Sequence, residues 1–182
     1  MINTYYGTAI LDAFFHTSYH DTGKTDDTKN AITSAQLKDN NNNIVQFPKE
    51  PYIALFTDMP DASGADYKEP TSTYYNRVSL VKKGPANLQT MSKATTENGT
   101  GEYAGKEVAV IKNQDIIVFR EVEDDIGYSK NVVGFGVFDT PDKDTGTLML
   151  WGELTSAATG GTPIGGHEIP VFRIGEFIFK LA

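Results

Sequence analysis

Short apolar runs separated by turn residues constrain the fold of this 182-residue chain more than any other feature. From residue 44 onward the runs are rich in Val, Ile, Phe and Tyr, and Gly, Pro, Asn or Asp bounds them. This pattern is typical of strands joined by turns. No long amphipathic helix is present to cover a parallel sheet, so antiparallel pairing is expected. The predicted strands are residues 44–47, 52–57, 77–82, 107–112, 115–119, 132–138, 147–154, 170–174 and 176–181.

The predicted fold is therefore mostly β: an antiparallel, jelly-roll-like β-sandwich with one short N-terminal helix and long loops. The strand before Asp139 shows how its two faces differ. Val133, Phe135 and Val137 alternate onto one face. Glycines at positions 134 and 136 occupy the other face, where another part of the chain is expected to approach closely.

A single domain spanning residues 1–182 is expected, because a chain of this length can bury one self-sufficient core. Residues 1–20 are assigned to the N-terminal helix, residues 21–49 to a polar loop insertion and residues 86–106 to a second loop insertion. The predicted core residues are Phe14, Ile53, Leu55, Val78, Leu80, Ile117, Phe119, Phe135, Val137, Leu148, Leu150, Phe177 and Phe179.

Composition excludes several kinds of chemistry. The chain has no cysteine, which rules out disulfides and thiol catalysis. Its formal net charge is -8 and it has no long run of Lys or Arg, so a nucleic-acid partner is not expected. We also expect no membrane partner, since no stretch has the 18 or so uninterrupted apolar residues of a spanning helix.

Candidate catalytic and metal-binding patterns are incomplete. His16 and His20 have the spacing of a helical metal pair, but Thr17 stands where a metalloprotease has its glutamate. Residues 139–146 resemble a calcium loop without its terminal glutamate and are better explained as a hairpin connection. The acidic residues 121–125 are adjacent, as in a solvated turn. We expect no catalytic residue, metal or cofactor, and hence no enzyme.

Aromatic side chains provide the candidate assembly contacts. Tyrosine suits protein–protein surfaces because it combines apolar area with a polar tip. An alternative interpretation, tyrosines half-buried beside strands, remains open. The candidates are Tyr5, Tyr6, Phe14, Phe15, Tyr74 and Tyr75.

Several segments, in order, resemble a family of virion structural proteins of long-tailed bacteriophages, whose members are described as minor tail or tail-fibre proteins. The segments are Tyr-Ile-Ala-Leu-Phe-Thr-Asp-Met-Pro-Asp at 52–61, Tyr-Asn-Arg-Val at 75–78, Val-Gly-Phe-Gly-Val-Phe-Asp at 133–139 and Gly-Thr-Leu-Met-Leu-Trp-Gly-Glu-Leu-Thr at 146–155. The opening segment at 10–14 and the closing segment at 172–181 also agree. The chain departs from the family pattern at residues 21–49 and 88–105, and Gly134 replaces a usual histidine.

The resemblance implies a virion structural protein that assembles in the bacterial host cytoplasm with other virion proteins, as a homo-oligomer or symmetric ring. A tail, baseplate or tail-fibre position is expected. Two alternatives remain open: a capsid decoration or head-fibre protein, and a module that binds a host surface glycan or protein.

Overall fold

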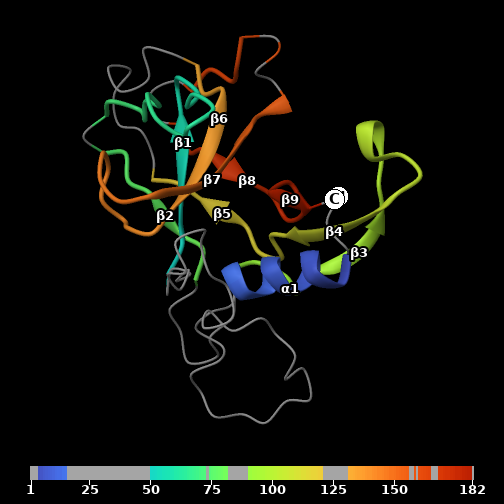
Figure 1. Cartoon of the computed structure of the whole chain (residues 1–182). Coiled ribbons are helices and arrows are strands. Elements are labelled where there is room, and N and C mark those ends of the chain that lie inside the picture. Colours follow the sequence, from blue (N-terminus) through green and yellow to red (C-terminus); the bar gives the residue numbers. More distant parts are fainter. Residues whose placement is uncertain are drawn as a thin grey trace, which may run out of the picture. The chain divides into compact units, whose positions relative to one another are not determined.

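The computed structural model describes residues 4–15, 50–72, 74–81, 90–120, 131–155, 158, 160–164 and 168–181 (Figure 1). The chain divides into two compact units, which are described separately. The first unit comprises Met1–Lys49, Val81–Ile116 and Arg173–Ala182, and the second comprises Glu50–Leu80 and Ile117–Phe172. The prediction of a single domain stays a prediction, because two such units can belong to one domain.

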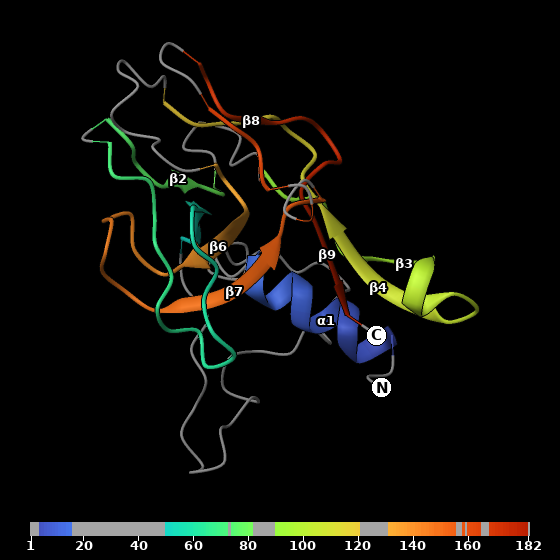
Figure 2. The ribbon, with the colours of Figure 1, turned by 90° about the horizontal axis from the view of Figure 1, so that it is seen from above.

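In the first unit, one helix packs on a three-stranded antiparallel sheet. The sheet has the order β3-β4-β9, formed by β3 (Thr95–Asn98), β4 (Glu107–Lys112) and β9 (Ile178–Leu181). Figure 2 shows α1 (Thr4–Phe15) running alongside this sheet. The described residues 101–103 form a short 3-10 helix between β3 and β4.

The helix buries its apolar face against the sheet because its apolar residues recur at helical spacing. Leu11 and Phe14 are buried, and Phe15 lies 5.1 Å from Phe179 between ring centroids. Gly7 allows close approach, since a Cβ at this position would lie 2.8 Å from the Cβ of Ala109.

Asn113 ties the end of β4 to the turn that precedes β9. Its side-chain amide is buried, and its Nδ2 donates to the carbonyl oxygens of Asp115 and Arg173, both at 2.8 Å. Its Oδ1 accepts from the backbone N–H of Phe177 at 2.9 Å. Every polar atom of this amide group is therefore used, as a buried amide requires.

In the second unit, a four-stranded antiparallel sheet has the order β2-β1-β6-β7 and a two-stranded ribbon pairs β5 with β8. Ring contacts from Phe172 to Phe135 and Phe119, both at 6.3 Å, join the ribbon to one face of the sheet in a sandwich-like arrangement. The elements are β1 (Tyr52–Phe56), β2 (Val78–Ser79), β5 (Ile117–Val118), β6 (Gly134–Phe138), β7 (Leu148–Glu153) and β8 (Val171–Phe172).

The opposite face of the four-stranded sheet is covered by the segment that follows β1. Phe56 and Phe138 are buried there, with Tyr67 at 5.1 Å from the Phe56 ring and 5.3 Å from the Phe138 ring. The glycines of β6 make this packing possible, as predicted. A Cβ at Gly136 would lie 2.7 Å from Leu148 and closer still to Phe56.

The predicted mostly-β fold with antiparallel sheets, one short helix and loops is confirmed. The strand at 107–112 has the predicted bounds, the other observed strands are shorter than predicted, and residues 44–47 lie outside the described residues. Of the predicted N-terminal helix at residues 1–20, Thr4–Phe15 is described and is helical, and residues 16–49 lie outside the described residues. Of the predicted core, Val78, Phe135, Leu148, Leu150 and Phe179 are half-buried, and the rest is buried.

The predicted loop at residues 86–106 needs a correction, because part of it is strand β3. Its sequence, Thr-Thr-Glu-Asn, has no apolar alternation to reveal a strand. This strand lies at the sheet edge, and most of its residues are exposed. Its extended conformation therefore depends on pairing with the apolar strand β4 and not on apolar residues of its own.

Candidate functional site: a buried ion pair and an exposed apolar face

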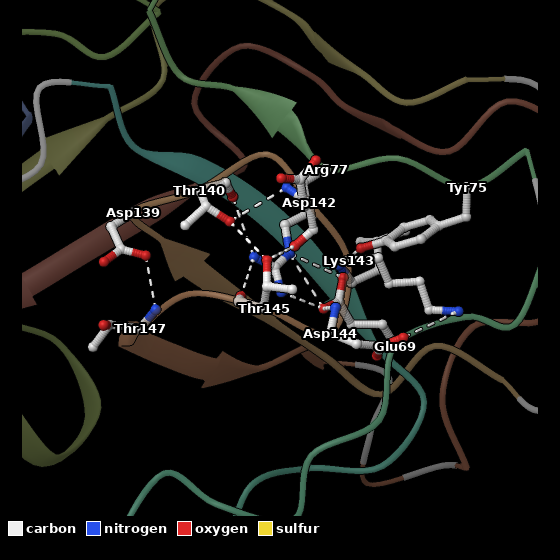
Figure 3. Close-up of polar contacts among 11 residues, drawn as sticks. Glu69, Tyr75, Arg77, Asp139, Thr140, Asp142, Lys143, Asp144, Thr145 and Thr147 are labelled. Carbon is white, nitrogen blue, oxygen red and sulfur yellow. Dashed lines mark hydrogen bonds and ion pairs between the residues drawn. The ribbon is translucent and has the colours of Figure 1, made fainter.

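A buried ion pair occupies the second unit beside the connection between β6 and β7 (Figure 3). Arg77 Nη2 lies 2.6 Å from Glu69 Oε1, and Arg77 Nε donates to both Glu69 oxygens at 3.2 Å. Both side chains have a relative exposure of 0%. Charges removed from water in this way need several partners to compensate for lost hydration.

Arg77 obtains those partners from the hairpin connection. Its Nη1 donates to the carbonyl oxygens of Thr140 at 3.2 Å and Thr145 at 2.9 Å. Its guanidinium carbon also lies 3.5 Å from the centroid of the Phe138 ring, a cation–π contact. The pair therefore joins the residue that precedes β2 to both ends of the connection between β6 and β7.

The connection itself is a hairpin loop, as predicted from its Asp, Pro and Gly residues. The Oδ1 atom of Asp139 accepts from the backbone N–H of Thr147 at 2.7 Å. Gly146 has a φ of 77° and Asp144 a φ of 60°, conformations that glycine and aspartate tolerate better than most residues. Hydrogen bonds to the backbone and the charge of Arg77 therefore hold the loop between β6 and β7 in one conformation.

Tyr75 lies buried next to the ion pair. Its hydroxyl oxygen accepts from the backbone N–H of Leu55 at 2.8 Å, and its ring stacks on Phe119 at 6.3 Å between centroids. Burial, followed by the charge of Glu69, raises the pKa of the Tyr75 phenol well above its usual 10.0. Burial and a hydrogen bond with Glu50 likewise raise the pKa of Tyr52 to about 12.

The candidate assembly residues are placed differently from one another. Phe14, Phe15 and Tyr75 are buried within their units, so they offer a partner almost no surface. Tyr74 is half-buried, with the guanidinium carbon of Arg120 at 5.4 Å from its ring centroid. Tyr5 and Tyr6 belong to α1, but their side chains lie outside the described residues. A role of these residues in assembly stays a prediction.

An exposed apolar area lies elsewhere, on the outer side of the β5–β8 ribbon. Val118 and Val171 are directly opposite each other in the register and are 48% and 44% exposed. Ile169 is 50% exposed and lies two residues before Val171, on the same side of an extended chain. We call Val118, Ile169 and Val171 the ribbon face.

Sequence analysis missed both the ion pair and the ribbon face. Arg77 begins a predicted strand that also contains Val78 and Leu80, and a charge beside such apolar residues is the signal that could have indicated a buried partner. The ribbon face gave a weaker signal, because a valine of a predicted strand can face the core or the solvent.

Most of the candidate catalytic and metal-binding residues lie outside the described residues, namely His16, His20 and residues 121–125. Within the described ranges, no group of three or more His, Asp or Glu side chains is arranged to hold a metal ion. Over the same ranges, no helix has the length and apolar character required to cross a membrane.

The antiparallel sheets, the backbone-anchored hairpin and the exposed apolar ribbon define a β-rich protein. The family model described as podophage GP4 fiber I protein gp80 matches residues 23–163, well over half of the chain. The chain belongs to this family, and the expected phage tail-fibre type of virion protein is confirmed. The description names a podophage, whereas the sequence resemblance pointed to long-tailed phages. No curated protein matches the chain.

Proposed function

We propose that this virion fibre-family protein has no enzymatic activity and acts by binding other virion proteins, at a tail, baseplate or tail-fibre position. The observation that carries the proposal is the ribbon face. Its three aliphatic side chains are about half exposed, on β5, on β8 and two residues before Val171. Apolar groups clustered at a surface are typical of protein–protein contact sites.

The chemistry of the ribbon face favours a protein partner. Valine and isoleucine carry no hydrogen-bonding group, so they cannot select a polar ligand such as a sugar. They can be covered by apolar side chains of another subunit, which removes their surface from water.

The inner side of the ribbon makes this face well suited to binding. Ile117 and Phe119 are buried directly beneath it, and Phe172 contacts the ring of Phe135 on β6. A surface supported by packed side chains loses little conformational entropy when a partner binds.

Substitution on the ribbon face tests the proposal. Phage lacking the gene would be complemented with the wild type, Val171→Lys or the control Thr96→Lys, which changes an exposed residue of β3. We expect Val171→Lys to lower incorporation into purified particles by roughly tenfold or more, the effect of about 1.4 kcal/mol of lost binding. The control should incorporate normally. Equal incorporation of all three proteins would contradict a role of this face.

Imaging of the same particles addresses the position. Density for the wild-type chain on the tail, the baseplate or a fibre supports the proposal. Density on the capsid surface would favour the capsid decoration or head-fibre alternative.

A second candidate function, binding of a host surface glycan, is favoured by Trp151. This residue is 40% exposed, and a Cβ at Gly64 would lie 3.4 Å from its ring, so the indole rests on a turn with no side chain at its apex. An open aromatic ring face can stack on a sugar ring. Glycan-array binding that is lost in Trp151→Ala and kept in Val171→Lys would support this candidate, and no binding by the wild type would oppose it.

A further inference from the structure

The dipeptide Asn98-Gly99, at the end of strand β3, is a candidate site of chemical modification in the first unit. The backbone nitrogen of a glycine that follows asparagine can attack the asparagine side-chain amide, because glycine has no Cβ to obstruct the approach. The sequence has no other Asn-Gly pair. Asn98 is exposed and lies on the edge strand of the order β3-β4-β9, so water and hydroxide can reach it (Figure 2).

The turn after β3 requires the glycine at position 99. A Cβ there would overlap the carbonyl oxygen of Tyr103 and would lie 2.6 Å from the Cβ of Tyr103. A larger residue would therefore displace the 3-10 helix Gly101–Tyr103. The packing of this turn retains the residue that makes Asn98 reactive.

The folded strand opposes the reaction. Ring closure requires the Gly99 nitrogen to lose its proton and to reach Cγ of Asn98. The N–H of Gly99 instead donates to the carbonyl oxygen of Lys106 at 2.7 Å. Asn98 is also part of the extended strand, and side chains in a strand stand roughly perpendicular to the chain direction. The reaction therefore requires local opening of β3 from β4, a motion of the kind that frees single segments without global unfolding.

The register of β3 and β4 indicates what the product would do. Asn98 is directly opposite Glu107. Because Gly99 and Lys106 form a bonded pair, the alternation of an antiparallel ladder makes Asn98 and Glu107 a non-bonded pair, whose side chains approach closely. A carboxylate at position 98 would face the carboxylate of Glu107. The other side chains of β3 and β4 on this face carry no positive charge, namely Thr96, Ala109 and Ile111.

We propose that Asn98 is a site of spontaneous deamidation, that opening of β3 controls its rate, and that the carboxylate produced weakens the pairing of β3 with β4. Hydroxide removes the proton of the Gly99 N–H, and this nitrogen forms a bond to Cγ of Asn98. The bond from Cγ to Nδ2 breaks, and ammonia leaves after the nitrogen takes a proton from water, which regenerates hydroxide. Water then opens the cyclic imide at either carbonyl carbon and gives aspartate or isoaspartate.

The inference goes beyond the proposed function, because it concerns a covalent change in the first unit and not binding at the ribbon face. Loss of ammonia makes the change irreversible, so it accumulates with the age of the protein. An isoaspartate also adds one carbon to the main chain, which displaces Gly99 from Lys106. Incorporation of Val171→Lys into particles does not depend on these steps, so the two proposals are tested separately.

Peptide mapping of the full chain by mass spectrometry tests the site and its control by opening. The protein would be incubated at mildly alkaline pH, folded or unfolded in urea. Thr95→Pro removes an N–H that the register directs to β4, at a distance of three residues from Asn98. We expect this variant and the unfolded chain to deamidate roughly tenfold faster or more than the folded wild type.

Asn98→Ser is the control and should show no conversion in the same peptide. Equal rates in the folded wild type, Thr95→Pro and the unfolded chain would overturn the role of opening. An unfolded chain that does not deamidate at Asn98 would overturn the site itself.

Hydrogen exchange tests the effect of the product. Asn98→Asp carries the new charge from the start, and Asn98→Ser is its neutral control. We expect the β3 amides of Asn98→Asp to exchange roughly twofold to fivefold faster than those of Asn98→Ser. Adding Glu107→Gln to Asn98→Asp should restore slow exchange, because the opposing charge is gone. Equal exchange in the two single variants, or no rescue by Glu107→Gln, would overturn the proposed weakening of the strand pair.

Discussion

Two ion pairs in this chain have the same separation and very different surroundings. The Arg77–Glu69 pair in the second unit and the Lys112–Glu97 pair in the first unit both have an N···O distance of 2.6 Å. The side chains of the former are 0% exposed, whereas those of the latter are 38% and 41% exposed. The distance alone therefore says little about what each pair contributes.

Hydration explains the difference. The exposed pair gains little free energy when its two charges meet, because water screens their attraction. The buried pair has lost its water entirely, so each charge depends on its protein partners. Arg77 meets this need through Glu69, two carbonyl oxygens and the Phe138 ring. Such a cluster fixes one arrangement of the hairpin, because any other would leave a charge unpaired.

The largest effect is expected when one charge of the buried pair is removed. Arg77→Met should lower the free energy of unfolding by about 3–5 kcal/mol, because Glu69 is left as an uncompensated buried charge. Urea denaturation would measure the loss. Lys112→Met in the exposed pair is the matched control, with an expected loss of about 0–1 kcal/mol. Similar losses in both variants would remove the distinction between the two pairs.

Removing both buried charges sharpens the comparison. The double variant Glu69→Gln with Arg77→Met should be less destabilised than the sum of its single variants, since neither charge is then left alone. Unfolding of the four proteins should give an interaction free energy of about 1–3 kcal/mol. The corresponding cycle at Glu97 and Lys112 should give less than about 1 kcal/mol. Additive effects at the buried pair would contradict this account.

Tyr75 extends the comparison to pH. Tyr75→Phe should cost about 1–3 kcal/mol at neutral pH, because the buried N–H of Leu55 loses its acceptor. The folded-state pKa of Tyr75 is raised above 10.0, so the unfolded chain releases this proton first. Wild-type stability should therefore be full below about pH 10 and fall as the pH rises toward the folded-state pKa.

Denaturation curves between neutral pH and pH 11 would measure this dependence. The fall should be shallower in Tyr75→Phe, although the raised pKa values of Tyr52 and Tyr67 keep part of it. Tyr74→Phe is the control, because the ring of Tyr74 is half-buried, whereas that of Tyr75 is buried. Parallel curves for the wild type and Tyr75→Phe would oppose the assignment.

The smallest effect is expected at the exposed pair. Glu97→Ala should lower the free energy of unfolding by about 0.2–1 kcal/mol at low salt, and 1 M salt should remove most of the difference. Denaturation at the two salt concentrations would measure it. A loss that is larger or independent of salt would mean that Glu97 acts through packing.

Local patterns were enough to predict most of the strands and the hairpin. Residues 107–112 were assigned with their observed bounds, because Val108, Val110 and Ile111 are β-branched and turn residues follow. Gly134 and Gly136 correctly indicated a closely packed face. β3 was missed because its sequence is polar and its pairing depends on β4.

The candidate sites depended on contacts between distant residues. Arg77 meets carbonyl oxygens that lie 63 and 68 positions further along the chain, a meeting that no local pattern encodes. Sequence analysis offers Tyr75 as a candidate contact and leaves a half-buried position open, because tyrosine suits both surfaces and interiors and its neighbours in sequence do not distinguish the two.

The sequence by itself determined the mostly-β class, the positions of most strands and the turn between β6 and β7, because alternation, β-branched residues and turn residues act within a few positions. Tertiary structure decided the order β2-β1-β6-β7, the burial of Glu69 with Arg77 and the exposure of Val118 and Val171. The physical reason is that burial and charge pairing belong to the environment that distant segments create together. The identity of a residue determines whether it requires burial, a hydrogen-bond partner or an opposite charge. The folded chain determines which distant residues supply these contacts.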